Sequence, residues 1–146
     1  MVKTGPRASS MTTITDFDRL VRAVEDYPKT VYLRYSRGPD ADTDGTPSRD
    51  YESGAQLPGL SVTVLTPEPW WIRPTADWIA RRVCKYAELG DEERQPWILV
   101  GEVVGRGPDH EPLVGEFVPL GWLAPAVVEQ ARDHYETRFD VGRSSR

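Results

Sequence analysis

The sequence predicts an α+β fold, in which a mostly antiparallel sheet of about four or more strands is packed by three helices and connected by long loops. Two observations lead to this prediction. The strand-like and helix-like segments do not alternate regularly, which argues against the repeated strand–helix–strand order of a parallel sheet. The chain also has 12 glycines and 13 prolines among its 146 residues, which is typical of a chain interrupted by many turns.

Length and charge narrow the class of protein. We expect one domain over residues 13–141, with flexible tails over 1–12 and 142–146. A net charge of −5 argues against a protein that binds duplex nucleic acid. No run approaches the roughly 18 apolar residues of a membrane span, so we expect no membrane association. Cys84 is the single cysteine and cannot form an intrachain disulfide, which favours a reducing, cytoplasmic setting.

Three segments have the periodicity of a helix. The first follows Thr15, the expected N-cap, and ends at Tyr27 before a proline. The second runs over residues 75–89 and the third over 125–139, with a proline at the first helical position. The apolar stripe of the first helix is formed by Phe17, Leu20, Val21 and Val24.

Four segments have the pattern of a strand. They are residues 30–36, 60–65, 97–104 and 113–118. In the first of them Leu33 belongs to an apolar face, whereas Arg34 and Ser36 belong to the opposite face. The last two strands are expected to form an antiparallel hairpin with a long tip.

The polar face of the first strand is a candidate anion site. Arg34 presents a planar fork of donors that suits phosphate or carboxylate, and Ser36 lies on the same side. The alternative, which we favour on general grounds, is an arginine that is exposed or salt-bridged on a solvated sheet face.

The hairpin tip, residues 107–112, is a second candidate. It places His110 between Asp109 and Glu111, and such groups could serve acid–base chemistry or a weak metal site. The alternative is a turn whose geometry is set by glycine, proline and an aspartate bonded to its own backbone, and we favour the turn. The other histidine, His134, is expected to be solvated on the last helix.

The acidic segment 40–45 matches the opening of a calcium-binding loop, DADTDG. The bidentate glutamate of such a loop would fall at position 51, which is Tyr51, and Pro47 would lie inside the loop. We therefore favour a solvated acidic loop inside the long connection 37–58 and assign no metal ligands. The alternative is a looser calcium site within the Asp40–Asp44 loop.

Aromatic and cationic residues gather in and after a proline-rich segment. They are Trp70, Trp71, Trp78, Arg73, Arg81 and Arg82. Tryptophans beside arginines could stack a planar ligand or form a partner-binding surface. The alternative is that the tryptophans pack an irregular segment onto the sheet, and we favour it for at least one of Trp70 and Trp71.

Three segments resemble a family of small actinobacterial proteins known only as a domain of unknown function. The segments are 32–36 (YLRYS), 57–62 (LPGLSV) and 105–114 (GRGPDHEPLV). This resemblance extends over residues 15–141 and implies a bacterial cytoplasmic protein without indicating an activity.

The layout also resembles small ADP-ribosyltransferase-like domains. These carry an arginine on an early strand, a Ser-x-Ser/Thr element on the next and a glutamate on a late strand. The resemblance implies that Arg34 holds the phosphates of NAD, that residues 61–63 (SVT) form the second element, and that Glu102, Glu111 or Glu116 binds the nicotinamide ribose. The Glu-x-Glu pair of protein-modifying members is absent.

Taken together, the sequence predicts a polar pocket for a small anionic molecule or nucleotide, with NAD as the candidate cofactor. The candidate catalytic residues are Ser61, His110 and Glu111, and the candidate cofactor-binding residues are Arg34, Ser36, Trp70 and Trp71. The alternative function is a non-catalytic interaction module that uses the Trp70–Trp71 loop, with a homodimer as one form. The sequence leaves open whether the protein is an enzyme.

Overall fold

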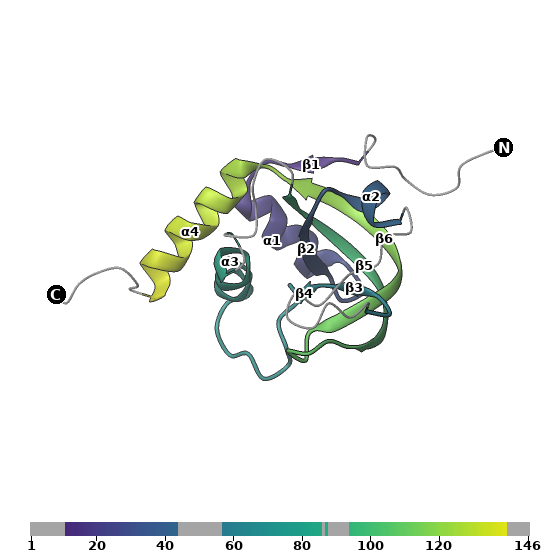
Figure 1. Ribbon diagram of the computed structural model, residues 1–146. Helices are drawn as coiled ribbons and strands as arrows, with labels where there is room; N and C mark the ends of the chain where they lie inside the picture. Colours follow the sequence, from purple (N-terminus) through teal and green to yellow (C-terminus); the bar gives the residue numbers. More distant parts are fainter. Residues whose placement is uncertain (1–10, 44–56, 86, 88–93, 140–146) are drawn as a thin grey trace.

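The computed structural model describes residues 11–43, 57–85, 87 and 94–139. These residues form a six-stranded sheet and four helices, which confirms the predicted α+β class. In chain order the elements are β1 (Thr13–Ile14), α1 (Phe17–Asp26), β2 (Tyr32–Ser36), α2 (Pro39–Thr43), β3 (Leu60–Ser61), β4 (Thr63–Val64), α3 (Thr75–Lys85), β5 (Gln95–Arg106), β6 (Pro112–Leu123) and α4 (Pro125–Phe139) (Figure 1). None of these helices is long and apolar enough to cross a membrane.

The sheet is mixed rather than purely antiparallel. Strand β1 runs parallel to β6, with Thr13 opposite Trp122, whereas the other ladders are antiparallel. A strand of two residues is too short to show alternation, so β1 had no signal in the sequence. Met11 and Thr12 fall in the expected N-terminal tail. Here Met11 packs against the barrel-side core defined below, and the Thr12 carbonyl accepts the Trp122 N–H at 2.9 Å.

Several element boundaries differ from the expected ones, and both strands of the hairpin, β5 and β6, are longer than the expected 97–104 and 113–118. Asp16, and not Thr15, caps α1, because the Asp16 carboxylate accepts the Asp18 N–H at 3.0 Å. The long connection after β2 was expected to lack structure but begins with α2, and Pro39 takes the first helical position. The described part of α3 ends at Lys85, and the expected end of that helix lies outside the described residues.

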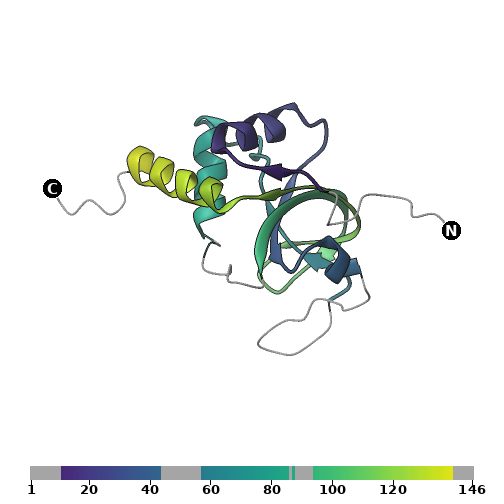
Figure 2. The ribbon, with the colours of Figure 1, turned by 90° about the horizontal axis from the view of Figure 1, so that it is seen from above.

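The predicted strand over residues 60–65 is two short strands with different neighbours. Strand β3 pairs with β6, with Leu60 opposite Val114, and β4 pairs with β2. Between them the Val62 N–H donates to the Pro112 carbonyl at 3.2 Å. The segment thus connects β6 to β2, and since β2 and β6 both pair with β5, the sheet curls and closes on itself (Figure 2).

The closed sheet separates two apolar cores. Helices α1, α3 and α4 lie together on one side of the sheet (Figures 1 and 2), and the helix-side core lies between them and the strands. Its larger members are Phe17, Leu20, Leu33, Leu65, Trp78, Ile79, Ile98 and Leu123. The barrel-side core lies on the opposite face of the strands and contains Tyr32, Leu60, Val62, Trp97, Leu99 and Val114. The predicted alternation of faces along β2 is therefore confirmed.

Irregular pairing accounts for the strong curl of the hairpin. The β5–β6 ladder shifts register between Ile98 and Leu99, between Gly101 and Val103, and between Val103 and Gly105. Each shift bends the strand and increases its twist locally. Twelve-residue strands can therefore wrap around the barrel-side core instead of extending past it.

Gly38, between β2 and α2, offers a test of how tightly this turn is built. Its φ is +119°, and a Cβ there would lie 2.7 Å from Cη2 of Trp122. We expect Gly38→Ala to lower the free energy of unfolding by about 2 kcal/mol, measured by chemical denaturation. Gly105→Ala is the control, because its Cβ would meet only ordinary contacts at 3.8 Å. An equal loss in both variants would contradict this account.

Candidate functional site

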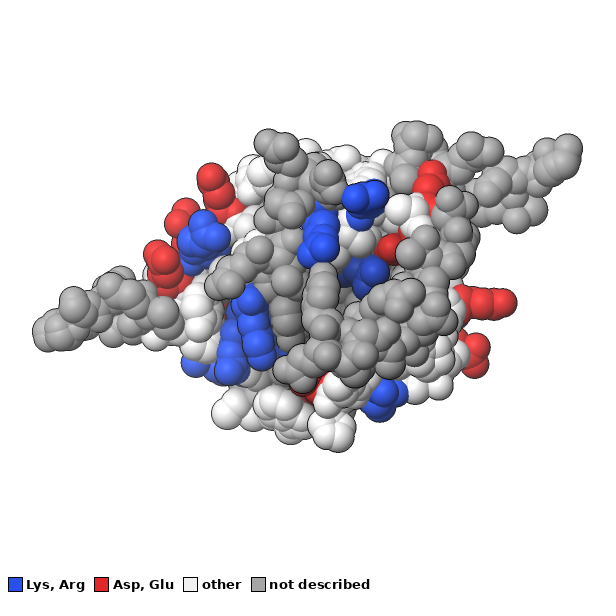
Figure 3. Space-filling model, in the orientation of Figure 1, with Lys and Arg blue, Asp and Glu red and all other residues white. Residues whose placement is uncertain are grey.

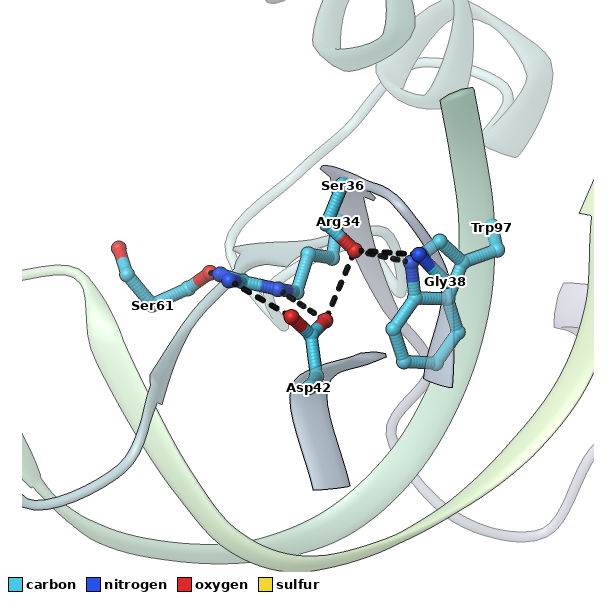
Figure 4. A network of polar contacts seen from close by, with 6 residues as sticks. All are labelled: Arg34, Ser36, Gly38, Asp42, Ser61 and Trp97. Atoms are coloured by element: carbon cyan, nitrogen blue, oxygen red, sulfur yellow. Dashed lines mark hydrogen bonds and ion pairs between the residues drawn. The ribbon is translucent and has the colours of Figure 1, made fainter. Parts of the chain in front are cut away.

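Arg34 lies on the barrel side of β2, where internal acceptors surround its guanidinium. Its Nε donates to Oδ2 of Asp42 at 2.7 Å, and its Nη2 lies 3.4 Å from Oδ1 of the same carboxylate. Its Nη1 donates to the Ser61 carbonyl at 2.8 Å (Figure 4). The side chains of the ion pair are 17% and 11% exposed, so this arginine is salt-bridged but not on a solvated face.

Ser36 is the hub of the same network. Its hydroxyl donates to Oδ2 of Asp42 at 2.8 Å, and it accepts the Gly38 N–H at 3.0 Å and the indole N–H of Trp97 at 2.9 Å (Figure 4). Trp97 is fully buried in the barrel-side core. Ser36 therefore joins the apolar interior to the Arg34–Asp42 ion pair.

Ser61 connects this network to the hairpin tip. Its hydroxyl donates to Oε2 of Glu111 at 3.0 Å, and Oε1 of Glu111 accepts the Asp109 N–H at 3.0 Å. The Gly107 N–H donates to the Glu111 carbonyl at 2.9 Å, which closes the turn. The expected aspartate-bonded turn is thus held by a glutamate, whose other oxygen reaches β3.

The structure brings four of the predicted site residues into one network. Arg34 and Ser36 share Asp42, and the contacts continue from Arg34 through Ser61 to Glu111. His110 is adjacent in sequence but exposed, and its φ of 65° belongs to the turn. Glu102 and Glu116, the other candidates for a ribose-binding glutamate, lie exposed on β5 and β6. Of the three glutamates, Glu111 is the one that contacts Ser61.

The tryptophan pair lies against the helix-side core, not beside the Arg34 network. Trp70, Trp71 and Trp78 form a cluster of edge-to-face contacts with ring centroids 5.1–6.3 Å apart. Trp71 is half-buried against the core, which matches the packing alternative for one of the pair. Trp70 is 66% exposed and Ile72 is 95% exposed.

The acidic segment is only partly described. Asp42 directs its carboxylate to Arg34 and Ser36, and Asp44 lies outside the described residues. Among the described residues, no group of three or more His, Cys, Asp or Glu side chains could hold a metal ion.

Cys84 and Tyr35 lie together on the helix side of the sheet. Burial raises the pKa of the Cys84 thiol, so the thiolate needed of a nucleophile is disfavoured. Burial also raises the pKa of Tyr35 to about 12, and its hydroxyl donates to the Val83 carbonyl at 3.3 Å. Both residues are therefore parts of the core.

A buried carboxylate that the sequence analysis missed joins α3 to α4. Asp77 is fully buried, and its two oxygens lie 2.8 Å from Nε2 of His134, 3.1 Å from Nε of Arg73 and 3.3 Å from Nε of Arg138. The expectation of a solvated His134 is wrong, because the helix crossing directs its ring to Asp77. The spacing of Arg73 and Asp77, four residues apart, is the one signal present in the sequence.

Beside this cluster runs a groove of about 370 Å³ between α1 and α4. Asp16, Phe17, Asp133 and His134 are among its lining residues. The Phe17 N–H, at the start of α1, donates to the side-chain oxygen of Gln130 at 2.8 Å. The groove is thus the seam where the first and last helices meet.

Opposing effects set the charge of Asp77. Burial raises its pKa, but hydrogen bonds from His134 and Arg73 and the positive charges of Arg138 and Arg73 lower it, and together they prevail. A carboxyl whose folded pKa lies below its ordinary value of 3.8 stabilises the fold above about pH 4. That contribution is lost as the pH falls through the folded pKa.

We therefore expect Asp77→Asn to lower the free energy of unfolding by about 3 kcal/mol at pH 7, since it removes one partner of a buried charge cluster. The difference from the wild type should narrow below about pH 4, where the wild type loses the same interaction. Denaturant titrations at several pH values measure both effects. Glu129→Gln, at an exposed position of α4 outside the groove, is the control. A difference that stays constant down to pH 2 would contradict the assignment.

Comparison with known families gives a match over nearly the whole chain. Residues 7–145 match the model of DUF6098, which is described as a family of unknown function. Searches of curated proteins and of solved structures find no match.

Proposed function

Since the chain belongs to this family of unknown function, we propose an activity from its own geometry: the Arg34 network binds a nucleotide and cleaves the nicotinamide–ribose bond of NAD. The observation that carries the proposal is the contact chain Arg34–Ser61–Glu111. It joins the arginine, serine and glutamate that an ADP-ribosyltransferase-like site requires, although they come from three different strands or turns.

In this proposal Glu111 is the catalytic residue. A carboxylate beside the nicotinamide ribose accepts a hydrogen bond from a ribose hydroxyl and stabilises the positive charge that develops on the sugar. Nicotinamide leaves with the electron pair of the glycosidic bond. Water then adds to the same ribose carbon and releases a proton, so the products are nicotinamide, ADP-ribose and a proton.

In this proposal Ser61 positions Glu111, and Arg34 binds the phosphates of NAD. The Ser61 hydroxyl holds Oε2 of Glu111 at 3.0 Å, and its carbonyl is held by Nη1 of Arg34. The guanidinium supplies the planar donors that a phosphate prefers. Trp70 and Trp71 have no place in this site, because they pack on the helix side of the sheet.

The first test compares two glutamates of the same hairpin. We expect Glu111→Gln to lower the rate of nicotinamide release from NAD at least 100-fold, while its affinity for NAD changes far less. Glu116→Gln should keep the wild-type rate, because Glu116 is exposed on β6. Nicotinamide is measured by chromatography and NAD binding by calorimetry. The proposal is refuted if the wild-type protein shows no heat of NAD binding and no nicotinamide release. It is also refuted if Glu111→Gln keeps full activity.

A second candidate function, an interaction module, is supported by the exposed apolar loop between β4 and α3. Trp70 and Ile72 are 66% and 95% exposed. Basic side chains gather over α3 in the space-filling view, and Arg82 and Lys85 lie in its last turn (Figure 3). Exposed tryptophan beside arginine is the composition of an interface hot spot.

Light scattering during size-exclusion chromatography tests the homodimeric form of this module. If the loop joins two copies, replacing both Trp70 and Ile72 by alanine should shift a dimer to monomer, with a dissociation constant at least tenfold higher. Val118→Ala, at another exposed apolar position, is the control. A wild-type protein that stays monomeric at high concentration would exclude the dimer.

A further inference from the structure

We infer that Asp42 determines the specificity of the Arg34 site, because its carboxylate occupies the position of the anionic group of the ligand. The inference rests on the proposed nucleotide site and deepens it. In this inference the ligand phosphate binds the Nε and Nη2 side of Arg34 that Asp42 occupies, so the ligand must compete with an anion that the protein itself supplies.

The geometry of the ion pair carries this inference. Oδ2 and Oδ1 of Asp42 face Nε and Nη2 of Arg34 at 2.7 Å and 3.4 Å, the side-by-side arrangement that two phosphate oxygens adopt on a guanidinium. The third nitrogen, Nη1, is bound to the Ser61 carbonyl. The Asp42 side of the guanidinium is therefore the side at which an incoming anion can exchange.

Ser36 adds a second donor at the same place. The hydroxyl oxygen accepts hydrogen bonds from the Trp97 indole and the Gly38 N–H, and its proton is directed to Oδ2 of Asp42. The Trp97 bond does not depend on Asp42. When the Asp42 carboxylate moves away from Arg34, the hydroxyl proton of Ser36 is available to the ligand. Arg34 and Ser36 then donate the hydrogen bonds that water gives to the free anion.

The exchange explains which ligands the site would accept. The charges of Arg34 and Asp42 cancel, so the pair attracts an anion with a single charged oxygen only weakly. A ligand binds more favourably than Asp42 only if it presents at least two anionic oxygens to Nε and Nη2 of Arg34, as a pyrophosphate does. A neutral or singly coordinating ligand leaves the internal ion pair in place.

The test uses the full-length protein with inorganic pyrophosphate and ADP-ribose as probes, measured by calorimetry. Asp42→Asn keeps the size of the side chain but removes its charge, and we expect it to bind pyrophosphate about tenfold more tightly than the wild type. Glu116→Gln makes the same change in net charge at an exposed position and should leave the affinity near the wild-type value. The melting temperature of each variant reports whether it is folded.

A folded Asp42→Asn with unchanged or weaker pyrophosphate affinity would overturn the inference and leave Asp42 as a structural brace of Arg34. If that variant does not fold, the ¹⁵N resonance of Arg34 Nε in the wild type decides. It should move as pyrophosphate is added, and a resonance that stays fixed to millimolar concentration overturns the inference. This outcome can be distinguished from failure of the proposed activity. If Asp42→Asn binds pyrophosphate more tightly but the protein releases no nicotinamide, the inference that a ligand replaces Asp42 stands and NAD cleavage is refuted.

Discussion

The crossing of residues 60–64 between β6 and β2 is the contact on which the rest of the site depends. Two short ladders and the Val62–Pro112 hydrogen bond of 3.2 Å hold it in place. If this segment moved away, the Ser61 carbonyl would leave Arg34 and the Ser61 hydroxyl would leave Glu111. The barrel-side core would also lose Leu60 and Val62 from one wall. The same segment therefore closes the sheet and holds the Arg34–Ser61–Glu111 contacts together.

The two sides of the sheet divide the polar interactions between them. On the barrel side, Arg34 is neutralised by Asp42 and its hydrogen bonds are internal. On the helix side, Asp77 is buried against Arg73, His134 and Arg138, whose hydrogen bonds and arginine charges lower its pKa. A buried charge requires such partners, because its desolvation costs several kcal/mol. The first network orders the turn after β2, and the second fixes α3 against α4.

Sequence patterns predicted the elements that are long enough to show a period. The alternation around Leu33 and Arg34 placed each residue on the correct side of the sheet, and the heptad-like stripe located α1. Strands β1, β3 and β4 have two residues each, and neither they nor the five-residue α2 can show a period. The closure of the sheet was therefore beyond pattern analysis.

The side-chain pairs of the two polar networks could not be predicted from local sequence patterns either. Ser61 and Glu111 are 50 positions apart. The hairpin tip made Glu111 a candidate by itself, but its pairing with Ser61 came from a family resemblance with which three glutamates were equally compatible. Asp77 and His134 are 57 positions apart, and nothing near His134 indicates a carboxylate partner. Contacts of this kind depend on how helices and strands cross, which local sequence does not encode. Asp42, considered for calcium, proved to be the counter-ion of Arg34 for this reason.

The late hairpin has a consequence for the order in which the chain can acquire its structure. Among the strands that the structure describes, β1 and β3 pair with β6 alone, and β2 needs β5 on one of its edges. A nascent chain that ends before Gln95 holds four of the six strands, yet the β2–β4 ladder is the one pairing among the described strands that it can form. Residues 95–123 act as the template on which the earlier half is assembled. Until they emerge from the ribosome, the edge of β2 that pairs with β5 and the apolar faces of the first half remain open to other chains.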